Sequence, residues 1–143
     1  MSIRHVGIVV NNLSKMVEFY KLLGFEEYLE TNIKGELIDE LIGLHNVDIE
    51  IVKLKSIKDN FILELLNYKN NNIGNLDKTN NRELFGLGTF HLAFTVDNID
   101  DIYNKLKLIG IKFTSPPLLT SDNVKVCFCR DWENNFVELV EEK

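Results

Sequence analysis

An internal repeat constrains the fold of this chain more than any other feature. The stretch Ile3–Phe25 reads IRHVGIVVNNLSKMVEFYKLLGF, and the stretch Thr89–Ile111 reads TFHLAFTVDNIDDIYNKLKLIGI. Aligned without a gap, they place His5 on His91, and each also has an asparagine and a glycine at matching positions. The chain therefore contains two copies of one structural unit.

A second match closes each copy. Residues 62–66 read ILELL and residues 136–140 read FVELV, so that Glu64 corresponds to Glu138. Both segments are short and rich in Ile, Leu and Val, which is typical of buried strands. Each copy thus opens with a histidine on a predicted strand and closes with a glutamate on a predicted strand.

The periodicity of apolar residues predicts the same order of elements in both copies: strand, helix and three strands. In the first copy we expect strands at Ile3–Val10, Phe25–Ile33, Val47–Leu54 and Phe61–Tyr68, with a helix from Asn12 to about Leu23. Glu36–Asn46 is ambiguous and could form a short helix ended by Gly43. In the second copy we expect strands at Thr89–Val96, Ile111–Phe113, Val124–Arg130 and Asn135–Glu141, with a helix over Asn98–Leu108.

Neither copy can cover both faces of its own sheet. We therefore predict an α+β fold in which two paired βαβββ modules form a cupped, incomplete eight-stranded barrel with the helices outside. The 143 residues fit a single domain. Its predicted parts are a first module at residues 1–68, an Asn-rich linker at 69–87 and a second module at 88–143.

Composition excludes several classes of function. The net charge is −6 and no stripe of Lys and Arg is present, which argues against nucleic-acid binding. No apolar run approaches the roughly 20 residues of a membrane span.

Cys127 and Cys129 are two residues apart on a predicted strand, so they share a face but are poorly placed for a disulfide. Free thiols predict a reducing, cytoplasmic setting.

The repeated histidines and glutamates predict a metal site. Alternation along the closing strands turns Glu64 and Glu138 away from the apolar helix-facing side, into the predicted cup. An enclosed carboxylate is costly unless it is paired or bound to a metal ion. With His5 and His91, the two acids carry a total charge of −2, which a divalent cation neutralises. Nitrogen and oxygen donors suit Ni, Co, Fe, Mn or Zn better than Ca.

Simpler interpretations exist for each residue taken alone. A lone strand histidine is more often structural, and a lone strand glutamate more often faces water. The recurrence of both at matching positions favours a shared site. His45 has no counterpart in the second copy and is interpreted as a surface residue, and Trp132 as a turn residue.

With these motifs, the chain resembles the vicinal oxygen chelate superfamily, which includes glyoxalase I, methylmalonyl-CoA epimerase, extradiol dioxygenases and drug-resistance proteins. The resemblance covers nearly the whole chain, and it implies a metal held by His5, Glu64, His91 and Glu138, the set of bacterial glyoxalase I. Members commonly form homodimers. Two motifs depart from glyoxalase I: residues 66–70 read LNYKN where Asn-Trp-Gly is usual, and residues 131–134 read DWEN where Asp-Pro-Asp-Gly is usual.

The resemblance implies a lyase or isomerase of the glyoxalase I type, acting on a small 2-oxo or hemithioacetal substrate. The cation would stabilise an enediolate as a Lewis acid. Glu138 is expected to be the base that moves the proton, with Glu64 as its partner on the opposite side.

Three alternatives remain open. The first is a 2-substituted acyl-CoA epimerase, for which Arg4, Lys125 and Arg130 are candidates to contact the CoA phosphates. The second is a non-catalytic drug-binding resistance protein, although such proteins tend to lack the full ligand set. The third, a dioxygenase, ranks last because Glu64 would occupy a coordination position that this chemistry needs open.

Overall fold

The computed structural model describes residues 2–69 and 83–142. The chain divides into two compact units, residues 1–78 and 79–143, which we call module 1 and module 2. Residues 70–82, which make up most of the predicted linker, lie outside the described residues. Within the described ranges, no helix has the length and apolar character needed to cross a membrane.

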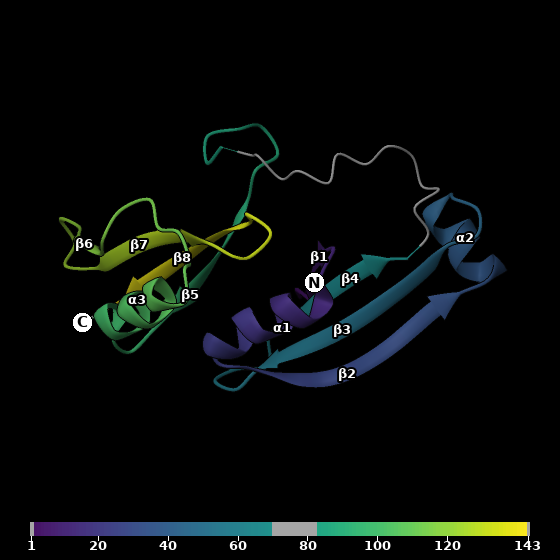
Figure 1. Cartoon of the computed structure of the whole chain (residues 1–143), viewed down its shortest axis with the longest axis horizontal. Helices are drawn as coiled ribbons and strands as arrows, with labels where there is room; N and C mark the ends of the chain where they lie inside the picture. Colours follow the sequence, from purple (N-terminus) through teal and green to yellow (C-terminus); the bar gives the residue numbers. More distant parts are fainter. Residues whose placement is uncertain (1, 70–82, 143) are drawn as a thin grey trace. The chain divides into compact units, whose positions relative to one another are not determined.

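Module 1 is a four-stranded sheet with two helices (Figure 1). Its elements are β1 (Val6–Val9), α1 (Leu13–Leu22), β2 (Phe25–Lys34), α2 (Glu36–Ile42), β3 (Asp48–Ser56) and β4 (Ile62–Tyr68). The strand order is β1-β4-β3-β2, in which β1 is parallel to β4 and the other neighbours are antiparallel. The Asn12 side chain caps α1 by accepting a hydrogen bond from the backbone N–H of Lys15. The ambiguous segment before β3 is a helix, α2, and it ends at Gly43.

Module 2 repeats this plan with a sheet of order β5-β8-β7-β6. Its elements are β5 (His91–Thr95), α3 (Ile99–Leu108), β6 (Leu118–Leu119), β7 (Lys125–Arg130) and β8 (Phe136–Glu141). Strand β5 is parallel to β8, and the other neighbours are antiparallel. Helices α1 and α3 stop before Gly24 and Gly110, whose φ angles of 89° and 93° favour glycine. The two predicted βαβββ modules are thus confirmed, and their assembly into a cup stays a prediction.

The predicted strand at Ile111–Phe113 is wrong. Only Phe113 forms a bridge, to Cys129, and the first residue of this segment instead donates its N–H to Leu106 O at the end of α3. The first strand of the module's βββ portion is β6, which follows Pro116 and Pro117. Proline lacks a backbone donor, so pairing resumes only after these residues, on an edge strand.

The first predicted strand is longer than the observed one. His5 was expected within a strand, but it lies immediately before β1, whose first pair joins Val6 to Leu63. The β1–β4 ladder begins at this pair, so His5 lies just outside it. His91 lies on a strand, as predicted, but β5 begins at this residue and not at Thr89.

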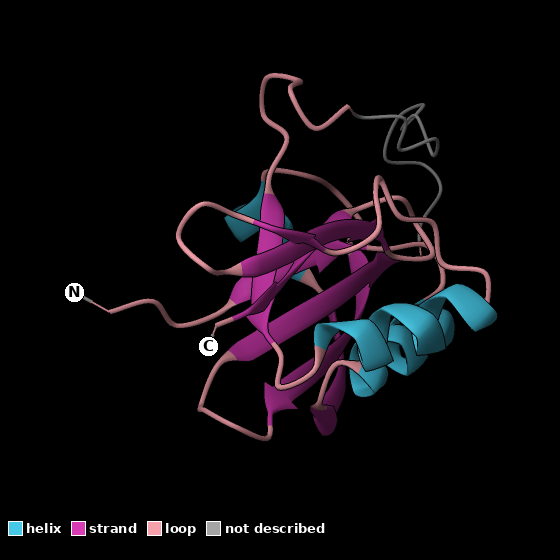
Figure 2. Cartoon of the chain, turned by 90° about the vertical axis from the view of Figure 1, so that its left-hand side faces the viewer, coloured by secondary structure: helices cyan, strands magenta, loops and turns pink. Residues whose placement is uncertain are grey.

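Each sheet buries one face against its long helix. Helix α1 lies along the module 1 sheet (Figure 1), and α3 lies along the module 2 sheet (Figure 2). The residues that flank the two glutamates in sequence are fully buried: Leu63, Leu65, Val137 and Leu139. Alternation therefore turns Glu64 and Glu138 to the opposite face. We call this the site face of each sheet.

Candidate functional site

On the site face of module 1, Glu64 and His5 approach each other. The carboxylate Oε2 of Glu64 lies 3.5 Å from Nε2 of His5. The Glu64 side chain is only 9% exposed, whereas the imidazole of His5 is 38% exposed. The Glu64 carboxylate is therefore held within the protein, whereas the His5 imidazole remains accessible to a ligand.

The second oxygen of Glu64 has a partner that sequence reasoning missed. Nζ of Lys53 lies 2.6 Å from Oε1 of Glu64. The two residues are direct partners in the β3–β4 ladder, so they share the site face. The Lys53 side chain is 27% exposed, which leaves this ion pair mostly enclosed. An enclosed ammonium compensates the buried charge of Glu64.

Apolar residues line one side of the cluster formed by His5, Glu64 and Lys53. Ile49 and Ile51 lie on the same strand and face as Lys53, and with Val47 they form a buried cluster. Ile38 and Ile42 of α2 pack against the cluster. The helix that interrupts the repeat therefore covers part of the site face and lowers the local dielectric beside the charges.

Module 2 presents the matching pair in different surroundings. Nε2 of His91 lies 3.1 Å from Oε2 of Glu138. The Glu138 side chain is 21% exposed, and the residue paired with it across the β7–β8 ladder is Phe128. The Phe128 ring meets the His91 ring edge to face, with centroids 5.3 Å apart. An aromatic residue thus stands where module 1 has Lys53.

The donor geometry of each pair fits a metal ion. Two ligand atoms at about 2.1 Å from one metal, at angles of about 90–110°, are about 3.0–3.4 Å apart. The observed separations of 3.5 Å for His5–Glu64 and 3.1 Å for His91–Glu138 are close to this range. Among the residues that the structure describes, no group of three or more His, Cys, Asp or Glu side chains could hold a metal ion. The four-residue centre stays a prediction that requires both pairs.

The other candidate residues have different surroundings. His45 is exposed, as predicted, and Trp132 is a turn residue that is 40% exposed. Lys125 lies on the α3 side of its sheet and pairs with Asp100. The Arg130 guanidinium lies 3.9 Å from the Phe136 ring centroid and donates to the carbonyl of Asn134. Arg4 is exposed.

Cys127 and Cys129 share one face of β7 and are free thiols, as predicted. This face is the helix-facing side, and both residues are buried. Burial is the main cause that raises the pKa of Cys127 to about 11 and the pKa of Cys129 to about 12. Nearby acidic groups add to both shifts: Asp100 acts on Cys127 and Asp131 on Cys129. These thiols are core residues and are poor metal ligands or nucleophiles.

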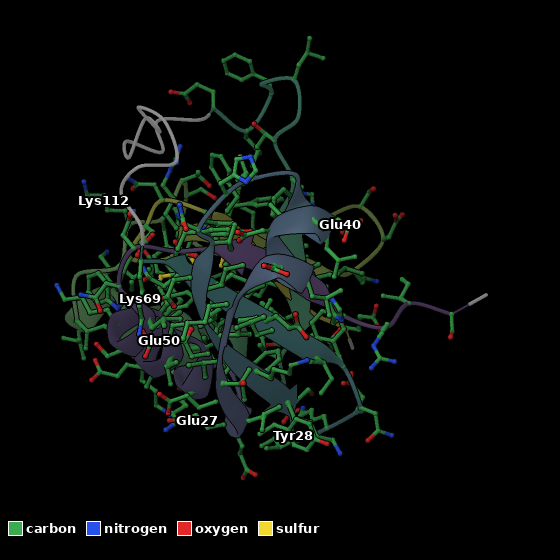
Figure 3. All side chains as sticks on the ribbon, turned by 90° about the vertical axis from the view of Figure 1, so that its right-hand side faces the viewer. Glu27, Tyr28, Glu40, Glu50, Lys69 and Lys112 are labelled. Atoms are coloured by element: carbon green, nitrogen blue, oxygen red, sulfur yellow. The ribbon has the colours of Figure 1, made fainter. Side chains whose placement is uncertain are left out.

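Two surface hollows of module 1 lie apart from the polar group. One, of about 490 Å³, surrounds the β3–β4 turn. The other, of about 560 Å³, lies on the α1 side of the sheet and is lined in part by Glu27 and Glu50. Figure 3 shows Glu50 beside Lys69, whose Nζ lies 3.4 Å from Oε2 of Glu50. Since neither hollow is lined by His5 or Glu64, neither marks the predicted site.

Comparison with known proteins supports this fold. Crystal structures with the same fold include a glyoxalase family protein from Bacillus cereus (23% identity, TM-score 0.88, covering 98% of this chain and 93% of that chain). A glyoxalase family protein from Enterococcus faecalis has 25% identity and a TM-score of 0.67, covering 98% and 97%. The fosfomycin resistance protein FosX from Listeria monocytogenes, in a complex with Mn(II) and sulfate, has 12% identity and a TM-score of 0.63, covering 99% and 93%.

Comparison with curated protein sequences finds no match. The family model of the glyoxalase/bleomycin resistance protein/dioxygenase superfamily, however, matches residues 2–139. This is nearly the full length of the chain and includes both histidine–glutamate pairs. The chain therefore belongs to the glyoxalase/bleomycin resistance protein/dioxygenase superfamily.

Proposed function

We propose that the protein is a metal-dependent lyase or isomerase of the glyoxalase I type that moves a proton on a small 2-oxo or hemithioacetal substrate. One observation carries the proposal. On the site face of each module, a histidine nitrogen and a glutamate oxygen lie within 3.5 Å of each other. The superfamily contains epimerases and resistance proteins as well as glyoxalases, so this donor set is what favours an enzyme of this type.

His5, Glu64, His91 and Glu138 would hold one divalent cation between them. Their nitrogen and oxygen atoms suit Ni, Co, Zn, Mn or Fe. A relative of the same fold, FosX, is described with Mn(II). When bound, the cation would act as a Lewis acid on the oxygens of the substrate.

The surroundings of the two carboxylates favour different roles. Glu64 has Lys53 on one oxygen, so its negative charge is already compensated. Glu138 instead has an imidazole and an aromatic ring as neighbours, and its side chain is more exposed. We therefore assign Glu138 as the base that takes a proton from the substrate carbon and returns it to the neighbouring carbon. Such a transfer leaves the summed oxidation state of the two substrate carbons unchanged, so it needs no redox cofactor.

The test is a substrate screen on purified protein loaded in turn with each of the five metals. Hemithioacetals should be turned over, chelation should abolish turnover, and metal should restore it. Glu138→Gln should lower kcat by about 10³-fold with an unchanged circular dichroism spectrum. Glu142→Gln, at an exposed position beyond β8, is the matched control and should retain full activity.

Each other outcome points elsewhere. Turnover of 2-substituted acyl-CoA esters alone would favour an epimerase. Tight binding of a drug without turnover would favour a resistance protein. An active Glu138→Gln variant would refute the assignment of the base.

A further inference from the structure

The two modules differ at one ladder position that faces the predicted ligands. The residue across from Glu64 is Lys53, and the residue across from Glu138 is Phe128. Each glutamate also has a histidine near one of its oxygens. Apart from the cover that α2 gives to module 1, the cross-strand neighbour is therefore the main difference between the two carboxylates.

Lys53 limits what Glu64 can offer to a cation. Its ammonium lies 2.6 Å from Oε1, a short, charge-assisted contact. Oε2, which lies near His5, is then the oxygen more open to a cation. Lys53 therefore favours binding of a cation by Glu64 through one oxygen over binding through both.

Lys53 also places a positive charge close to any cation bound by Glu64. Since the two oxygens of a carboxylate are only about 2 Å apart, an ammonium on one oxygen lies within several ångströms of a metal on the other. The pair is mostly enclosed, and apolar Ile49 and Ile51 lie on the same face, so solvent screens this repulsion weakly. The repulsion opposes cation binding at the first pair.

We propose that Lys53 is a positioning residue that holds Glu64 as a one-oxygen ligand and weakens the affinity of the site for its divalent cation. The inference rests on the proposed function, because it concerns the ligand set of that same site. Lys53 keeps Glu64 oriented and compensated without a cation, and the cation is exchanged more easily as a result. Module 2 has no equivalent charge at the matched position, where Phe128 stands.

Removal of this charge should strengthen binding of Mn²⁺. In Lys53→Gln, the amide can still donate a hydrogen bond to Glu64 but carries no charge, so orientation is kept while the repulsion is lost. We expect the Kd for Mn²⁺, measured from the electron paramagnetic resonance signal of the free ion, to fall about tenfold or more. Lys53→Met, which removes the hydrogen bond together with the charge, is the second variant, and circular dichroism checks that each variant folds.

Lys55→Gln is the matched control. Lys55 is two residues further along β3 on the same face, where its Nζ lies 5.9 Å from the Tyr28 ring centroid. The Lys55→Gln substitution removes the same unit of positive charge from the chain but leaves the ammonium beside Glu64 in place. We expect a change in Kd of less than about twofold.

The outcomes separate the two proposals. Wild-type protein that binds Mn²⁺, with a Kd unchanged or raised in Lys53→Gln, would overturn the role of Lys53 and leave the proposed function in place. Wild-type protein that binds none of the five metals would contradict the proposed function. In that case a gain of Mn²⁺ binding in Lys53→Gln would support the role of Lys53, and no gain would overturn it as well.

Discussion

Loss of Lys53 should destabilise the metal-free protein through Glu64. The Glu64 side chain is 9% exposed, and it has Lys53 on one oxygen and the imidazole of His5 3.5 Å from the other. Lys53→Met leaves this carboxylate enclosed without its ammonium. Glu64→Gln leaves Lys53, which is 27% exposed and can turn toward water. The two single substitutions should therefore have unequal costs.

The magnitude follows from distance and burial. Two unit charges at the observed 2.6 Å attract by about 6 kcal/mol at an effective dielectric constant of about 20. Desolvation offsets much of this gain. We expect the free energy of unfolding to fall by about 3 kcal/mol in Lys53→Met, about 1 kcal/mol in Glu64→Gln and about 2 kcal/mol in the double variant. The corresponding coupling energy is about 2 kcal/mol.

Urea unfolding followed by circular dichroism, with chelator present, measures the four free energies of this double-mutant cycle. The Lys21–Glu27 pair supplies a control cycle in the same module, because its side chains are 48% and 46% exposed. That pair should show less than about 1 kcal/mol of coupling. A Lys53–Glu64 coupling below about 0.5 kcal/mol would mean that Lys53 does not compensate Glu64, and the argument for its effect on cation binding would fail.

Two further predictions concern module 2. The buried carboxylate of Asp131 accepts hydrogen bonds from the backbone of Glu133 and from the backbone and side chain of Asn135. Asp131→Ala should cost about 2–3 kcal/mol in urea unfolding, against less than about 0.5 kcal/mol for the exposed Asp122→Ala. Because the pKa values of Cys127 and Cys129 are raised to about 11 and about 12, at most about one thiol in a thousand is ionised at pH 8. Ellman's reagent should react with both only after unfolding in guanidinium, and fast reaction of the native protein would contradict their burial. The stability from these raised pKa values is fully present below about pH 8.5 and is lost as the pH rises toward about 12.

Sequence reasoning identified the features that repeat. Strict alternation around Glu64 and Glu138 predicted which way each side chain turns, and the full burial of their sequence neighbours confirms the direction. It failed where tertiary contacts override local pattern. The apolar segment after α3 looked like a strand, but its first residue, Ile111, bonds to the end of the helix. Apolar character alone cannot separate these two outcomes.

Lys53 was missed because the repeat is not in register along its whole length. The closing glutamates match at a fixed spacing, and at that spacing Lys53 would align with Cys127. The ladder instead matches it with Phe128, because 11 positions separate Lys53 from Glu64 (64 − 53) and 10 separate Phe128 from Glu138 (138 − 128). The turn of module 1 is one residue longer, and a shift of one residue exchanges the two faces of a strand. The residue that most distinguishes the two carboxylates can therefore be found only from strand pairing, since it lies across the ladder and not along the sequence.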